Sequence, residues 1–114
     1  MNDIDKLETL FSQSDLPKSI IKTLLQNRGD IEPPYLANTE KLLEIYLKRL
    51  SILIDDKKAH LTKIVEEFVR NLKNYKEESV KVFIFKGDNV MYIFASTDMT
   101  QLLGVIYSAQ PNQE

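Results

Sequence analysis

His60 is the one histidine of the chain and the first residue to consider for acid–base chemistry. Asp56 lies four residues earlier, so on a helix its carboxylate could orient the imidazole. Pairs with this spacing are routine on exposed helix faces, and both residues belong to a polar run. The simpler interpretation is a solvent-exposed histidine without a catalytic role.

Other chemistries lack the residues that they need. The sequence has no cysteine, so it offers no thiolate nucleophile, and a single histidine cannot build the usual zinc site of Cys and His ligands. The three glycines are isolated from one another and form no phosphate-binding loop. Carboxylates are paired only as sequence neighbours, at Glu66-Glu67 and Glu77-Glu78. We therefore predict a non-enzymatic protein without catalytic residues, cofactor or metal.

Residues 57–86 carry 8 basic and 4 acidic side chains, within a chain whose net charge is −2. Basic residues beside aromatic side chains are typical of single-strand nucleic-acid binders, in which the rings stack on bases. Against this function, the glutamates interleave with the lysines and the overall charge is acidic. A nucleic-acid-binding module is therefore the alternative function. Membrane binding is not expected, because the long helical stretch carries both charge signs.

The chain has 114 residues, 43% of them hydrophobic, which is enough for one domain over residues 1–114. No apolar run is long enough to cross a bilayer, and no signal sequence is apparent at Met1. The absence of cysteine fits a cytoplasmic location. The polar residues 109–114 predict a disordered tail.

Two short helices are expected near the N-terminus. The first spans Asp3 to Ser12, where apolar residues share one face and acidic residues occupy the N-terminal end. Ser14 or Asp15 caps the second, which ends at Gly29. Residues 30–38 contain two adjacent prolines and are predicted to form a loop.

The longest helical pattern runs from Thr39 to Tyr75 without a glycine or proline, and Asn38 or Thr39 would cap it. Its apolar residues recur at alternating steps of four and three, the coiled-coil-like seam of a helix that packs along its length on another helix. The predicted seam consists of Leu43, Leu47, Leu50, Ile54, Leu61, Val65, Phe68 and Leu72.

A polar run at residues 55–58 interrupts this seam and allows two interpretations. Without a helix-breaking residue, the stretch favours one continuous or kinked helix about 55 Å long at 1.5 Å per residue. Such a rod would overhang a domain of this size, and its uncovered seam predicts a homodimer. Alternatively, Asp55 or Asp56 caps a second helix, and the seam folds back on itself without a partner.

Beyond Tyr75 the apolar period changes from helical to two. Residues 80–85 and 90–95 predict a β-hairpin, with a two-residue turn at Gly87-Asp88 that pairs Phe83 with Tyr92. Both sides of this hairpin are apolar, so it must be covered twice or extended by further strands. The aromatic side consists of Phe83, Phe85, Tyr92 and Phe94, and the aliphatic side consists of Val80, Val82, Ile84, Met91, Ile93 and Ala95.

The segment after the hairpin allows two interpretations. Ser96 or Thr97 could cap a short helix, or residues 102–107 could form a third strand, since Gly104 and its neighbours are mediocre helix formers. The predicted fold class is α+β and mainly helical. It comprises two short helices, one long or kinked helix, a β-hairpin, and a short C-terminal helix or third strand.

These apolar surfaces also predict a function. Few helices remain to cover the aromatic side of the hairpin, so a partner protein or an identical subunit is expected to cover Phe83, Phe85, Tyr92 and Phe94. The expected protein is a regulatory interaction module, such as a regulator, adaptor, inhibitor or immunity-type factor. It would act by occluding or scaffolding its partner.

Overall fold

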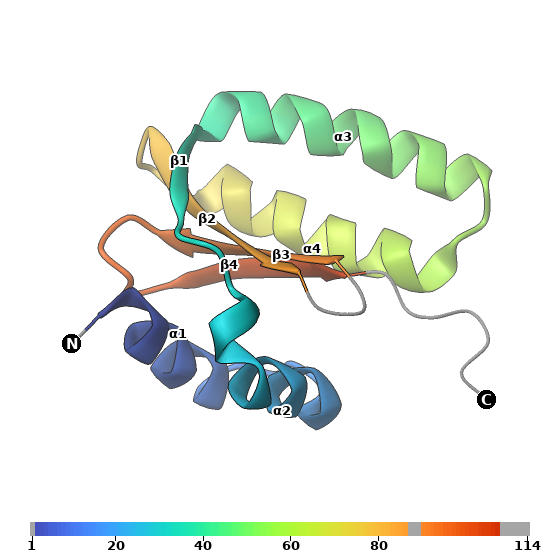
Figure 1. The fold of residues 1–114 in the computed structure, drawn as a ribbon. Coiled ribbons are helices and arrows are strands. Elements are labelled where there is room, and N and C mark those ends of the chain that lie inside the picture. The colour runs from blue at the N-terminus through green and yellow to red at the C-terminus, as the bar shows by residue number, and fades with distance from the viewer. Residues whose placement is uncertain (1, 87–89, 108–114) are drawn as a thin grey trace.

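The computed structural model describes residues 2–86 and 90–107. The four strands within these residues form one antiparallel sheet in the order β1-β2-β3-β4. Figure 1 shows α1 and α2 on one side of the sheet and α3 and α4 on the other. In chain order the elements are α1 (Asp3–Ser12), α2 (Lys18–Gln26), the 3-10 helix η1 (Arg28–Asp30), β1 (Tyr35–Asn38), α3 (Thr39–Asp55), α4 (Ala59–Asn74), β2 (Ser79–Lys86), β3 (Val90–Ser96) and β4 (Leu102–Tyr107).

The predicted fold class was wrong in its layout. Helices and strands interleave along the chain, because a strand precedes the long helical stretch and this stretch is two helices, not one. The hairpin is also not a separate ribbon, since β1 and β4 extend it on both edges. The predicted tail at 109–114 and the predicted turn residues 87 and 88 lie outside the described residues.

Strand β1 falls within the segment that was predicted to be a loop. Tyr35 pairs with Val82 of β2, and just before the strand the Glu32 amide donates to the Ile84 carbonyl at 2.9 Å. Prolines are compatible with this place because β1 is an edge strand, where one side of the backbone needs no partner. A strand of four residues is too short to show a clear period of two in its sequence. It can therefore be recognised only from its pairing with β2.

The first helix was predicted correctly at both ends. Asn2 caps it, with its Oδ1 accepting a hydrogen bond from the Asp5 amide at 2.9 Å. The second helix is shorter than predicted, because it starts only after Pro17 and gives way to η1 before Gly29 is reached.

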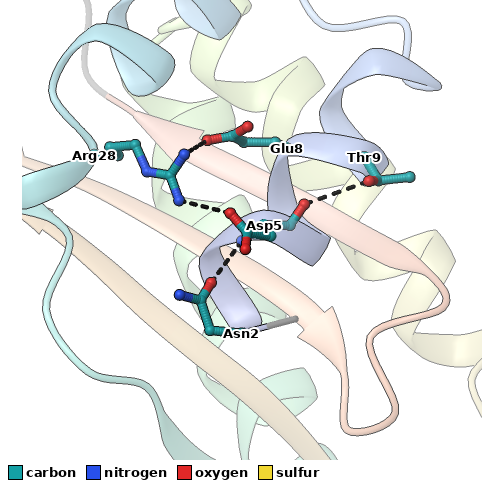
Figure 2. A network of polar contacts seen from close by, with 5 residues as sticks. All are labelled: Asn2, Asp5, Glu8, Thr9 and Arg28. Carbon is teal, nitrogen blue, oxygen red and sulfur yellow. Dashed lines mark hydrogen bonds and ion pairs between the residues drawn. The ribbon is translucent and has the colours of Figure 1, made fainter.

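A polar network joins α1 to η1 (Figure 2). Arg28 donates to the Asp5 carboxylate at 2.8 Å and also to that of Glu8, while the Thr9 hydroxyl donates to the Asp5 carbonyl at 3.3 Å. The hydrogen bond from the Arg28 guanidinium lowers the pKa of Asp5, and the same contact raises the pKa of Arg28. These groups are largely exposed, so water screens the interaction and its role is to orient the two helices more than to stabilise them.

The first helix of the long stretch, α3, ends at Asp55. Two residues later, Lys57 takes a left-handed backbone conformation with φ of 58°. The Lys58 amide donates to the Leu53 carbonyl and the Lys57 amide to the Ile54 carbonyl, each at 3.1 Å. This pair of bonds is the Schellman motif, in which glycine is the usual left-handed residue. The continuous or kinked helix was therefore wrong: a lysine terminates α3, and α4 turns back along it. The predicted cap at Asp55 or Asp56 was also wrong, since Lys58 precedes α4.

The register of the hairpin differs from the prediction by one residue. Lys86 pairs with Val90, so three residues separate the strands and Phe83 pairs with Ile93, not with Tyr92. A shift of one residue turns every side chain of one strand to the opposite face. The predicted aromatic side therefore does not exist, because Phe83 and Phe85 face one helix pair and Tyr92 and Phe94 face the other.

Both faces of the sheet are buried under helices. On one face, Phe83, Ile93 and Val105 pack against Leu7, Phe11 and Leu24 of α1 and α2. On the other, Val82, Phe94 and Leu103 pack against Leu42, Phe68 and Leu72 of α3 and α4. Phe68 stacks on Phe94 with ring centroids 4.2 Å apart, and Tyr46 meets both rings edge-on. The expectation that both apolar sides need cover is confirmed.

Residues 102–107 form strand β4, so the strand interpretation was right and the helix from Ser96 or Thr97 was wrong. The register shifts between Phe94 and Ala95, and Leu103 drops out of the regular pairing. The Asn71 side-chain amide donates to the Leu103 carbonyl at 2.7 Å, which satisfies a group that the irregularity frees. This bond also fixes α4 against the edge of the sheet.

At Gly104 the sheet leaves no room for a side chain beneath α4. A Cβ atom built on Gly104 would lie 2.9 Å from Cδ1 and 3.2 Å from Cβ of Phe68. Since the Phe68 Cβ is tied to the helix backbone, the contact cannot be relieved by a ring rotation alone. Gly104 is thus required for packing, not for a turn.

The first prediction concerns the helix terminator. Replacing Lys57 by Gly should stabilise the protein by about 0.5–1 kcal/mol, because glycine adopts the left-handed conformation without the clash of a Cβ. Urea unfolding at pH 7 measures this change. The matched control is Lys57→Ala, which removes the charge and keeps the Cβ, and should change stability by less than Lys57→Gly. Equal effects of the two variants would contradict the left-handed assignment.

The second prediction concerns the contact between α4 and β4. Gly104→Ala should destabilise the protein by about 1–3 kcal/mol, as expected for overpacking of a filled core. Gly29→Ala is the control, because a Cβ at Gly29 meets nothing within 4 Å. Thermal unfolding of both variants provides the comparison. A Gly104→Ala variant as stable as the parent would show that α4 does not press on β4 in this way.

Candidate functional site

The structure does not bring the residues considered for acid–base chemistry into a site. His60 is exposed in the first turn of α4, and Asp56 is the exposed C-cap of α3. No hydrogen bond or ion pair between these two residues is observed. Within residues 2–86 and 90–107, no three His, Asp or Glu side chains lie close enough together to hold a metal ion.

His60 lines a groove of about 740 Å³ that runs along the outer edge of β4. One wall is α4, which contributes Lys63, Glu67 and Asn71, and the other is the connection between α1 and α2. Its polar groups include both charge signs, and the Asn71 amide is already bonded to β4. The groove therefore shows no constellation that would favour one ligand chemistry.

Three of the four predicted partner-binding residues lie in the core of the monomer. Phe83, Phe85 and Phe94 are 0%, 2% and 1% exposed, so in this conformation no partner can reach them. Tyr92 alone stays accessible, at 36% exposed. The base-stacking surface needed for nucleic-acid binding loses the same three rings. Two of the basic residues beside it are paired, Lys81 with Asp3 and Lys86 with Glu32, each at 3.0 Å.

The predicted dimer seam divides into two halves. In α4, Val65, Phe68 and Leu72 are buried and Leu61 is half-buried, all within the monomer. In α3, Leu43 and Leu50 are half-buried against α4. Leu47 and Ile54 remain 43% and 53% exposed. The reversal at Lys57 thus buries the α4 half inside one chain and leaves part of the α3 half outside.

Helix α3 has apolar residues on more than the side that packs inward. Its inward row is formed by Leu42 and Leu53, which are buried, and Tyr46, which is half-buried. On the side away from α4, Ile45 and Ile52 are each 55% exposed. These two residues are seven apart, two helical turns, and therefore lie in line along the helix. We call this side of α3 the open flank; sequence reasoning missed it because it fitted only one seam to the helix.

The sheet exposes large side chains as well. Tyr35 of β1 is 50% exposed, and the registers place Tyr35 and Tyr92 on the sheet face that α3 and α4 cover. Arg49 lies one helical turn from both isoleucines of the open flank. Its charge lowers the pKa of Tyr46, whereas Tyr35 and Tyr92 raise it. Burial is the main cause that raises the pKa of Tyr46.

Basic residues interleave with the two isoleucines of the open flank. Lys41, Lys48 and Arg49 are exposed and alternate with Ile45 and Ile52 along the same side of α3. None of the three cations forms an ion pair with another residue among those that the structure describes. The candidate surface, formed by Tyr35, Ile45, Ile52 and Tyr92 with these cations, therefore combines apolar and positively charged side chains.

Comparison with known proteins found no matching family model, no matching curated protein and no matching solved structure. In the part of the chain that the structure covers, no helix combines the length and apolar character needed to cross a membrane. The candidate surface therefore stands on the geometry of this chain alone.

The third prediction compares two neighbours on α3. Leu53 is 6% exposed and Ile52 is 55% exposed, so truncation of each to Ala should have very different effects. Leu53→Ala should cost about 2–5 kcal/mol of unfolding free energy, whereas Ile52→Ala should stay within about 0.5 kcal/mol of the parent. Chemical denaturation measures both. A large loss in Ile52→Ala would show that the open flank serves the fold of the monomer instead of a partner.

Proposed function

We propose that this protein is a non-enzymatic interaction module that binds another protein through the open flank of α3 and the exposed tyrosines beside it. The observation that carries the proposal is the pair Ile45 and Ile52, more than half exposed on one helix face, together with Tyr35 and Tyr92. Exposed apolar residues that share one helix face are typical of protein-binding surfaces, and tyrosine is enriched in such surfaces.

The chemistry of the surface defines the kind of partner. The apolar residues favour aliphatic or aromatic side chains, and the cations among them, Lys41, Lys48 and Arg49, favour carboxylates. An amphipathic segment with apolar and acidic residues would meet both conditions. Its binding would cover α3 and occlude the partner's own surface, as a regulator, adaptor or inhibitor does. A cytoplasmic location, which the cysteine-free sequence predicts, stays part of this proposal.

The fourth prediction tests the surface by capture from cell extract, using the chain with a photo-crosslinking residue in place of Ile45 and nuclease treatment of the extract. We expect one or a few specific polypeptides that the double variant Ile52→Gln and Tyr92→Ser no longer captures. The variant Lys48→Glu with Arg49→Glu should weaken capture at least tenfold, because it reverses the charge of two side chains between Ile45 and Ile52.

The control variant is Leu25→Gln, which alters an exposed apolar residue of α2 on the other side of the sheet. It should leave capture unchanged. Capture that survives the substitutions of Ile52 and Tyr92, or that Leu25→Gln abolishes equally, would contradict the proposed surface. Capture that nuclease treatment removes would instead support the nucleic-acid alternative.

A further inference from the structure

The groove beside β4 follows an edge of the sheet that has no partner strand among the described residues. The side chains that line this groove favour no single ligand chemistry, but its floor is the backbone of β4 (Leu102–Tyr107). In the sheet order β1-β2-β3-β4, this strand is at an edge and pairs with β3 alone. An edge strand presents a row of amide and carbonyl groups to which another extended chain can bind.

The pairing of β3 with β4 shows which backbone groups point into the groove. The Ser96 amide donates to the Gln101 carbonyl at 2.9 Å, so the backbone groups of Ser96 point toward β4. Alternate residues of an antiparallel strand share this direction, and Tyr92 therefore bonds to its partner Ile106. Val105 precedes Ile106, so it directs its amide and carbonyl the opposite way, out of the sheet and into the groove that it lines.

These two groups of Val105 need a hydrogen-bonding partner. Val105 is 4% exposed, and within residues 2–86 and 90–107 no hydrogen bond to its outward amide or carbonyl is observed. Buried backbone groups of folded proteins are nearly always paired, so water that enters the groove must serve in the free chain. The carbonyl of Leu103 already has a partner in the Asn71 side chain. An extended chain in the groove would supply the equivalent groups to Val105.

The sequence of β4 offers little protection against pairing. Its six residues include neither a charged residue nor a proline. The opposite edge strand, β1, has four residues and follows the adjacent prolines Pro33 and Pro34. Short strands, charges and prolines are usual means by which sheet edges avoid new partners. The irregular pairing and the Asn71 side chain occupy only the start of β4, so its second half remains available.

The walls of the groove distinguish a single peptide from a second copy of the chain. Residues of α4 and of the α1–α2 connection line the same space as β4, so both walls extend past the edge of the sheet. A second copy that offered its own β4 would bring its own walls against these before the two strands could meet. A single extended peptide has no such layers and fits between the walls.

The backbone, more than the side chains, defines the occupant of this groove. Both walls mix polar and apolar side chains, and their charged residues, Asp15, Lys63 and Glu67, are of both signs. They therefore favour neither a strongly acidic nor a strongly basic peptide. The occupant must instead offer free amide and carbonyl groups in an extended conformation, which β-branched and aromatic residues favour and proline prevents.

We propose that the edge of β4 binds an extended peptide segment of another protein, which adds a strand to the sheet and pairs with the amide and carbonyl of Val105. In this mode of recognition the main-chain hydrogen bonds supply the affinity, and the walls select among alternate side chains. The groove shares no residue with the open flank of α3, so this site and the proposed function are tested separately.

The fifth prediction tests backbone pairing with the parent chain and a displayed library of short random peptides. Selected peptides are synthesised and then N-methylated at one backbone amide at a time. Methylation should weaken binding about tenfold at every second position and little at the positions between, because alternate amides of a paired strand donate to the edge. A library that yields no binding peptide, or methylation effects without this alternation, would overturn the proposal.

The matched variants remove one outward amide from each edge of the sheet. Val105→Pro should weaken peptide binding about tenfold or more, while the bonds from β4 to β3 do not use this amide. The control is Leu36→Pro in β1. The Thr39 amide donates to the Glu78 carbonyl, and Leu36, three residues earlier, points the opposite way, away from β2. This control should leave binding unchanged.

Circular dichroism establishes whether each proline variant is folded, and the methylation series decides the question if Val105→Pro is not. Equal effects of the two proline variants, when both are folded, would overturn the site on β4. Sedimentation velocity provides a further test. A dimer of the parent that Val105→Pro dissociates would overturn the proposal, because a second copy would then occupy the edge. None of these results depends on capture through the open flank.

Discussion

The central hairpin carries apolar side chains on both faces, and neither face can remain in water. Val80, Val82 and Phe94 point to one side, and Phe83, Phe85 and Ile93 point to the other. Each face needs its own cover, because a strand that is buried on two sides must lie between two layers. The division of the helices into two pairs follows from this requirement. So does the extension of the ribbon at both edges, which brings β1 and β4 into the sheet.

The cover on the α3 side depends on the reversal at Lys57. A continuous helix would carry the seam past the sheet, whereas the reversal brings Val65, Phe68 and Leu72 of α4 back over it. Phe68 then stacks on Phe94 and packs against Gly104. As α4 occupies this place beside β4, α3 is left with only one inward row. Its other apolar residues remain exposed on two flanks.

These two flanks of α3 expose different residues. One has isoleucines interleaved with cations, next to exposed tyrosines, and is suited to a molecule that supplies acidic groups. The other carries Leu47 and Ile54, with the small, uncharged Ser51 between them in sequence.

Local features of this protein could be predicted from the sequence alone. The bounds of α1 and the two hairpin strands follow from short-range preferences of neighbouring residues. The cap at Asn38 and the strand at 102–107 were each one of two alternatives that these preferences left open. The sequence also determined that both hairpin sides need cover and that residues for several common chemistries are missing.

Features that depend on contacts between distant residues could not be predicted without the folded structure. Strand β1 is too short to have a pattern without β2, and the hairpin register depends on three connecting residues instead of two, which exchanges the faces of one whole strand. Lys57 accepts a left-handed conformation whose cost the packing of α4 on α3 offsets, so no glycine marks the place. The candidate surface was hidden for the same reason: which of the apolar residues of α3 are left outside is known only once α4 and the sheet have taken their places.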